Sequence, residues 1–144
     1  MTKQTNSTYV KGAVKYINPD SLSKNPAFTN VVTVTGSVKT IYVGGQDAVD
    51  SSGAIVGKGD LKAQTEQILK NLEAALAAGG ARWEHVVKWN IYVVQGQSVQ
   101  EGFAAFQSIR GNQPNPPAIS VMFVAGLAHP DFLAEIDAIA VVPE

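Results

Sequence analysis

The chain has 144 residues, which suits one compact domain with a single core, and its 45% hydrophobic content is ordinary for a globular protein. Eleven basic against twelve acidic residues, scattered along the chain, argue against nucleic-acid binding. Without cysteine, disulfides, thiolate nucleophiles and zinc–thiolate sites are excluded, and His85 and His129 lack metal-ligand spacing, so we expect no metal or cofactor. The polar start and the short apolar runs predict a cytoplasmic protein without membrane contact.

The first half of the chain predicts two strands and a helix. The β-branched runs at 31–34 and 39–43 flank the turn signal Thr35-Gly36-Ser37 and are expected to form a hairpin. Asp60 can cap a helix whose apolar residues recur at helical spacing until Gly79-Gly80 ends it.

The second half predicts three strands and another helix. Residues 86–94 alternate between apolar and polar, which is typical of a strand. Ser98 and Glu101 have the spacing of a capping box, and the helix that follows places Phe103 and Phe106 on its inner stripe. After a loop at 111–117, residues 118–124 and 132–142 read as two strands. This order indicates an α+β fold with two helices on one face of a mixed sheet.

The strand at 118–124 is apolar on both faces: Ile119, Val121 and Phe123 point one way, and Ser120, Met122 and Val124 the other. Two helices on one face cannot cover both, so the excess apolar surface predicts a homo-oligomer. The alternative is that the N-terminal segment, with Tyr9, Val10, Tyr16 and Ile17, folds over the sheet.

The strongest candidates for chemistry are two acids on the last strand. Glu135 and Asp137 share one face, about 6.6 Å apart along the strand, and can act as an acid/base pair beside a cleft. The alternative is a solvated face on which the acids serve solubility. Gly44-Gly45 follows a strand without the spacing of a phosphate-binding loop, which favours a turn or a close backbone approach.

Three segments together resemble the reactive-intermediate deaminase family, RidA/YjgF: VGGQDAVDSSGAIVGKGDLKAQTEQILKNLEAALAAGG, VVKWNIYVV and AEIDAIAVV. The resemblance covers about residues 28–142, which leaves 1–27 as an N-terminal extension of a single domain spanning 1–144. It implies a chorismate-mutase-like fold and a homotrimer whose sheets form a central barrel, with small-molecule clefts between subunits. It also implies hydrolysis of imines and enamines, with an arginine that holds the substrate carboxylate and a glutamate that positions water.

The resemblance assigns the glutamate to Glu135, but Ile119 stands at the arginine position after Pro117-Ala118. Gly44 replaces a family serine, and Phe103 corresponds to a family asparagine. A carboxylate facing these apolar positions loses charge-assisted hydrogen bonds worth roughly 1.5 to 3 kcal/mol each. The residues expected to line the ligand cleft are Phe28, Gly44, Gly45, Phe103, Ile119, Ser120 and Val121.

Three functional hypotheses follow from the resemblance and its departures. The first is a divergent member that binds a small, weakly polar ligand between subunits, with imine deaminase activity absent or much reduced. The second is an active imine deaminase in which Glu135 positions water and the anion site is assembled from residues that the resemblance does not identify; Arg82 and Arg110, the only arginines, lie outside the strands that line the matched cleft and would have to reach it from a neighbouring subunit. The third is an endoribonuclease or translation inhibitor, as this family is often labelled, which the absence of a basic cluster disfavours.

Overall fold

The computed structural model describes residues 9–110 and 113–144, apart from the side chains of 109 and 110. None of the helices within these residues is long and apolar enough to span a membrane. In chain order the elements are β1 (Ala13–Ile17), β2 (Val31–Thr35), β3 (Val38–Gln46), α1 (Leu61–Ala78), the 3-10 turn η1 (Trp83–His85), β4 (Val86–Val94), α2 (Val99–Arg110), β5 (Ala118–Val124) and β6 (Ala134–Pro143).

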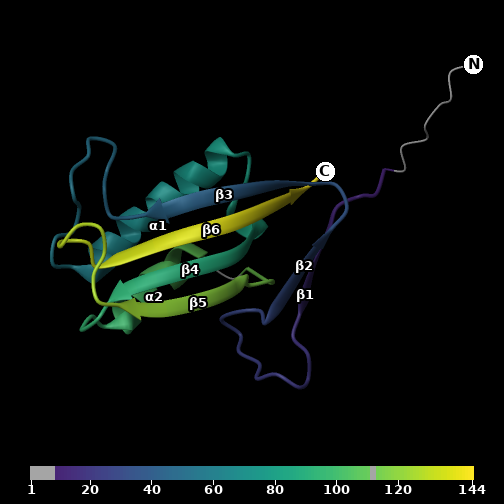
Figure 1. The fold of residues 1–144 in the computed structure, drawn as a ribbon, viewed down its shortest axis with the longest axis horizontal. Helices are drawn as coiled ribbons and strands as arrows, with labels where there is room; N and C mark the ends of the chain where they lie inside the picture. Colours follow the sequence, from purple (N-terminus) through teal and green to yellow (C-terminus); the bar gives the residue numbers. More distant parts are fainter. Residues whose placement is uncertain (1–8, 111–112) are drawn as a thin grey trace, which may run out of the picture.

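A four-stranded mixed sheet in the order β3-β6-β4-β5 forms the centre of the molecule. β6 pairs antiparallel with β3 on one side and with β4 on the other, while β5 runs parallel to β4 at the edge. Parallel neighbours need a crossover connection, which α2 supplies between β4 and β5. Both helices lie on one face, behind the sheet in Figure 1, and the opposite side is called here the open face. The predicted α+β fold is thereby confirmed.

The expected hairpin between residues 31–34 and 39–43 is wrong. β2 pairs instead with β1, a strand that the sequence did not predict, and β3 pairs with β6. Gly36 has a φ of 78°, and a Cβ added there would lie 2.3 Å from the main-chain oxygen of Lys11. The chain therefore turns at Gly36 towards the segment that precedes β1. Figure 1 shows β1 and β2 beyond the end of the four-stranded sheet rather than over its open face, unlike the alternative considered for the N-terminal segment.

Helix α1 forms the main layer over the sheet. It begins where Asp60 Oδ1 accepts the Ala63 amide at 3.1 Å, which confirms the predicted cap, and the helix ends before Gly79. Gly80, with a φ of 81°, completes the turn. The buried face of α1 consists of Leu61, Gln64, Thr65, Ile68, Leu69, Leu72 and Leu76.

Strand β5 presents an exposed apolar edge. Val121, Met122 and Phe123 are consecutive, and they are 49%, 37% and 53% exposed. No strand in the described part of the chain pairs with the outer side of β5. An unpaired edge with exposed apolar side chains is a common site for packing against another chain.

Candidate functional site

A small apolar pocket lies between the helices and the sheet. Leu61 and Thr65 of α1, Phe103 and Phe106 of α2, and Val121 of β5 contribute to its lining. Its volume is about 50 Å³, which is room for about four water-sized groups. The hydroxyl of Thr65 donates to the main-chain oxygen of Leu61 at 2.8 Å, and no charged side chain of the described residues lines the space. The pocket therefore suits an apolar or weakly polar group.

Two of the residues predicted for the ligand cleft, Phe103 and Val121, meet at this pocket. Among the residues that line the pocket, these two are exposed to solvent: Phe103 is 44% and Val121 is 49% accessible. Ile119 lies two residues before Val121 on the same face of β5, is level with Trp89 of β4, and packs against the core. An isoleucine is thus accommodated here by apolar packing.

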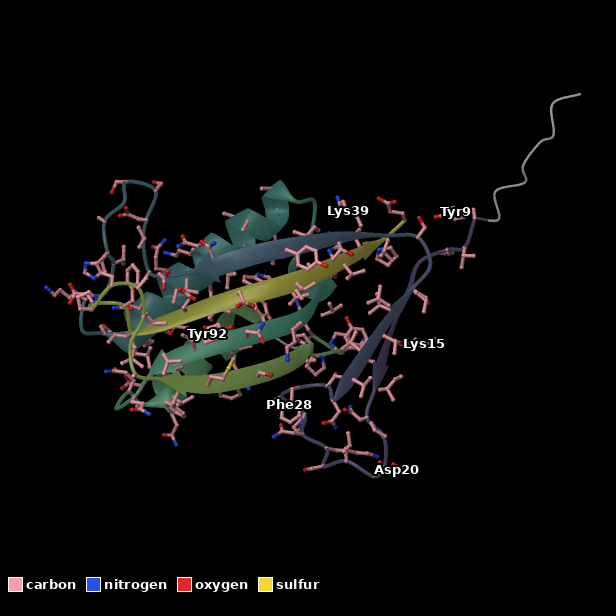
Figure 2. The ribbon with its side chains drawn as sticks, viewed as in Figure 1. Tyr9, Lys15, Asp20, Phe28, Lys39 and Tyr92 are labelled. Atoms are coloured by element: carbon pink, nitrogen blue, oxygen red, sulfur yellow. The ribbon has the colours of Figure 1, made fainter. Side chains whose placement is uncertain are left out.

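The open face of the sheet carries polar side chains instead. Asn90 Nδ2 donates to Asp137 Oδ1 at 2.8 Å, and the Tyr92 hydroxyl donates to Asp137 Oδ2 at 3.2 Å. The negative charge of Asp137 is the largest cause that raises the pKa of Tyr92. Lys88 Nζ donates to Ser120 Oγ at 2.8 Å, which places the predicted cleft residue Ser120 on this face. Figure 2 shows Tyr92 on the open face, in the part of the sheet that lies away from β1 and β2.

Glu135 lies on the open face, because its neighbours Ala134 and Ile136 both line the apolar pocket on the other side. It is level with Tyr92 of β4. A Cβ added to Gly45 would lie 2.7 Å from Glu135 Cδ and Oε2, so the carboxyl group lies against the backbone of β3. The predicted close backbone approach at Gly44-Gly45 is therefore found at Gly45.

The acid that pairs with Glu135 is Asp47 rather than Asp137. Asp47 follows directly after β3, and its carboxyl group lies close enough to Glu135 for that residue to raise its pKa. Burial is the largest cause that raises the pKa of Asp47, to about 7, followed by the hydrogen bond to Glu135 and the charge of Glu135. Sequence reasoning missed Asp47 because it stands in a loop with no periodic pattern, although it directly follows Gly44-Gly45-Gln46.

The start of β6 is held in place by a buried amide of α1. Gln64 Nε2 donates to the main-chain oxygen of Asp131 at 2.8 Å, and Gln64 Oε1 accepts the Leu133 amide at 2.9 Å. Gln64 is fully buried, so these bonds are shielded from water. They fix the main chain at Asp131 and Leu133, just before Ala134 and Glu135 of β6.

The remaining predicted cleft residues lie elsewhere in the chain. Gly44 is exposed, and a Cβ added to it would meet nothing within 4 Å. Phe28 lies in the loop before β2, near the start of β5 (Figure 2), where the following Thr29 amide donates to Pro117 at 3.1 Å. Within one chain, the predicted set is therefore divided between the apolar pocket, the open face and this loop.

No cationic side chain of the described residues lies beside Glu135 as a substitute for the family arginine. Arg82 is exposed and pairs with Glu84, and it precedes β4. Glu135 is level with Tyr92, six residues from the start of β4, which is about 20 Å along the strand. Lys88 is four residues from Tyr92, about 13 Å away. The side chain of Arg110 lies outside the described residues.

In residues 9–110 and 113–144, no group of three or more His, Asp or Glu side chains is arranged to hold a metal ion. The Asp47–Glu135 pair supplies two carboxyl groups and no nitrogen ligand. Two neighbouring carboxyl groups can exchange a proton and form hydrogen bonds.

Comparisons with known proteins identify relatives of this chain by sequence and by fold. The family model described as Endoribonuclease L-PSP matches residues 22–142. The RutC family protein slr0709 of Synechocystis is 36% identical over 107 residues, which cover 72% of this chain and 78% of that protein. A Yersinia pestis structure described as YyfB, a protein of unknown function of the conserved Rid family, is 32% identical, with a TM-score of 0.79 over 90% of this chain and 98% of that one. A putative endoribonuclease from Thermotoga maritima is 33% identical, with a TM-score of 0.65 over 72% and 79% of the two chains.

The fold and the site define an α+β protein in which a small apolar pocket and a carboxyl pair lie on opposite faces of one mixed sheet. Because the family model matches most of the chain, the protein also has a family: it belongs to the Endoribonuclease L-PSP family, which is the RidA/YjgF family. The resemblance of the glycine-Gln turn and the closing Glu-Ile-Asp strand to this family is thereby confirmed.

Proposed function

We propose that this protein is a divergent member of the RidA/YjgF family that binds a small, weakly polar molecule in a cleft between subunits, with imine deaminase activity absent or much reduced. The observation that carries this proposal is the lining of the pocket. Its exposed residues are Phe103 and Val121, and Ile119 occupies the position that the resemblance assigns to an arginine. An anionic substrate would lose hydration there without gaining a charged partner.

The subunit arrangement proposed for this cleft is a homotrimer. Its support is the exposed apolar edge of β5 next to the pocket, together with the trimeric barrel that the family resemblance implies. At micromolar concentration, light scattering is expected to give three times the 15.2 kDa mass of the chain. A monomeric mass would remove the cleft between subunits from the proposal.

A pair of probes with one carbon skeleton tests the ligand class. Methyl 2-oxobutanoate is neutral, whereas 2-oxobutanoate carries a carboxylate. Because the pocket offers no cation, we expect the ester to shift the amide NMR signals of Phe103 and Val121 at lower concentration than the acid. Tighter binding of 2-oxobutanoate, or shifts confined to other regions for both probes, would contradict the proposal.

Two substitutions in α2, one inside the pocket and one outside it, test whether the ester binds there. Phe103→Asp places a carboxylate in the pocket lining, whereas Gln100→Asp places it at an exposed position of the same helix. We expect Phe103→Asp to weaken binding of the ester by about tenfold or more and Gln100→Asp to leave it unchanged. Equal effects of the two substitutions would show that the ester does not use this pocket.

An active deaminase is a second candidate, and the observation that favours it is the Glu135–Asp47 pair, because a carboxyl group with a pKa near neutrality is suited to proton transfer. Ribonuclease activity, which the family description suggests, has less support. The chain has a net charge of −1 and scattered basic residues, whereas binding to the phosphate backbone requires a basic surface.

A further inference from the structure

The carboxyl group of Asp47 is in an unfavourable place for a negative charge. Its Oδ1 atom is buried and receives no donor from the described side chains or main chain. Its neighbour in α1, Asn71, directs its amide to the main-chain oxygen of Asp47 at 3.0 Å rather than to the carboxyl group. A buried carboxylate oxygen without a donor makes a negative charge on this partly buried group unfavourable.

Glu135 is held beside Asp47 by the shape of β3. The register of β3 against β6 shifts between Val43 and Gln46, and Gly45 lies within this irregularity. Because Gly45 has no Cβ, the carboxyl group of Glu135 occupies the space that a Cβ would fill. This brings Glu135 within hydrogen-bonding reach of Asp47. Two ionised carboxylates are both acceptors, so a bond between them requires one proton.

No positive charge in the described residues compensates the pair. The ion pairs formed by Lys, Arg and His in these residues involve neither Asp47 nor Glu135. The titratable groups that face Glu135 are Tyr92 from β4 and, two residues along β6, Asp137. Asn71, which faces Asp47 from α1, is neutral. A second negative charge on the pair would thus be opposed by repulsion and by burial.

We propose that Asp47 and Glu135 form a pH-sensitive carboxyl pair, in which one shared proton holds Glu135 against Gly45 and loss of that proton releases Glu135 towards the open face. Asp47 is then a positioning residue for Glu135. The raised pKa of Asp47, about 7, agrees with release in the neutral range. The inference goes beyond the proposed function, because it concerns the state of Glu135 whether or not a ligand occupies the apolar pocket.

Carbon-detected NMR of the side-chain carboxyl groups of the full-length protein, between pH 4 and 9, tests this inference. We expect the pair to show a titration step near pH 7, and the Gly45 amide signal to shift with the same midpoint. In Asp47→Asn, the amide can donate to Glu135 at every pH, so the step near pH 7 should disappear from the Gly45 signal.

Two glycine variants provide a matched comparison that leaves both acids in place. Gly45→Ala fills the space of the Glu135 carboxyl group, whereas a Cβ at Gly44 meets nothing within 4 Å. Neither glycine has a positive φ, so alanine is tolerated by the backbone at both. We expect Gly45→Ala to lower the midpoint of the step by only part of the way to the ordinary aspartate range, because the burial of Asp47 remains, and Gly44→Ala to leave it unchanged. Titration of both wild-type carboxyl groups below about pH 5, or a step that survives Asp47→Asn, would overturn the inference.

Discussion

Replacing Trp89 with alanine is expected to lower the free energy of unfolding by about 3 to 5 kcal/mol. Trp89 is 2% exposed and belongs to the buried core of the molecule. Its ring centroid is 5.6 Å from that of Trp83 and 5.7 Å from that of Phe106, with the Phe106 ring edge-on. The substitution removes these aromatic contacts and leaves a cavity that the rigid sheet cannot close.

The matched control for this prediction is Trp83→Ala. Trp83 has the same side chain in a partly exposed position of η1, so its removal should cost clearly less than that of Trp89. Both values come from urea unfolding at one protein concentration, because association stabilises the folded state. A loss below about 1 kcal/mol for Trp89→Ala, within the range of many surface substitutions, would contradict the packing described for the core.

The second large effect concerns the dependence of stability on pH. The pKa of Asp47 is raised in the folded protein from 3.8 to about 7, so between these values the folded state holds a proton that the unfolded state has lost. Stability is therefore highest below about pH 4 for this group and falls as the pH rises to about 7. Because the side chain is only partly buried, solvent screening reduces the effect to about 1 to 2 kcal/mol.

This contribution is obtained as the difference between the wild-type protein and Asp47→Asn, measured by urea unfolding between pH 4.5 and 8. Groups other than Asp47 contribute to both proteins and largely cancel in the difference. We expect the wild-type protein to lose stability relative to the variant as the pH rises through this window. A difference that is constant with pH would show that Asp47 has an ordinary pKa.

Elements with a local sequence pattern could be predicted from the sequence alone. Apolar spacing from Leu61 onwards, a capping Asp60 and the Gly79-Gly80 stop predicted α1, and alternation predicted β4. The pairing of β2 was not predictable in the same way, because strands pair over long separations in the chain. At Gly36, a single backbone conformation directed the chain towards β1 instead of into a hairpin.

The site shows the same division between local and long-range information. Alternation correctly separates Ile119 and Val121 from Ser120 within β5, and it places Glu135 and Asp137 together within β6. It does not say which face of one strand matches which face of another. That match is set by the register of both strands against β4, and it places Ile119 on the helix-facing side and Glu135 on the open face.

The proposal that imine deaminase activity is absent or much reduced is tested most directly by an imine hydrolysis assay. 2-Iminobutanoate is generated in the cuvette by an amino-acid dehydratase, and release of the keto acid is followed with and without this protein. We expect release at the uncatalysed rate, because none of the ion pairs in the described residues places a cation beside Glu135. Keto-acid release that increases in proportion to added wild-type protein would contradict the account and favour an active deaminase.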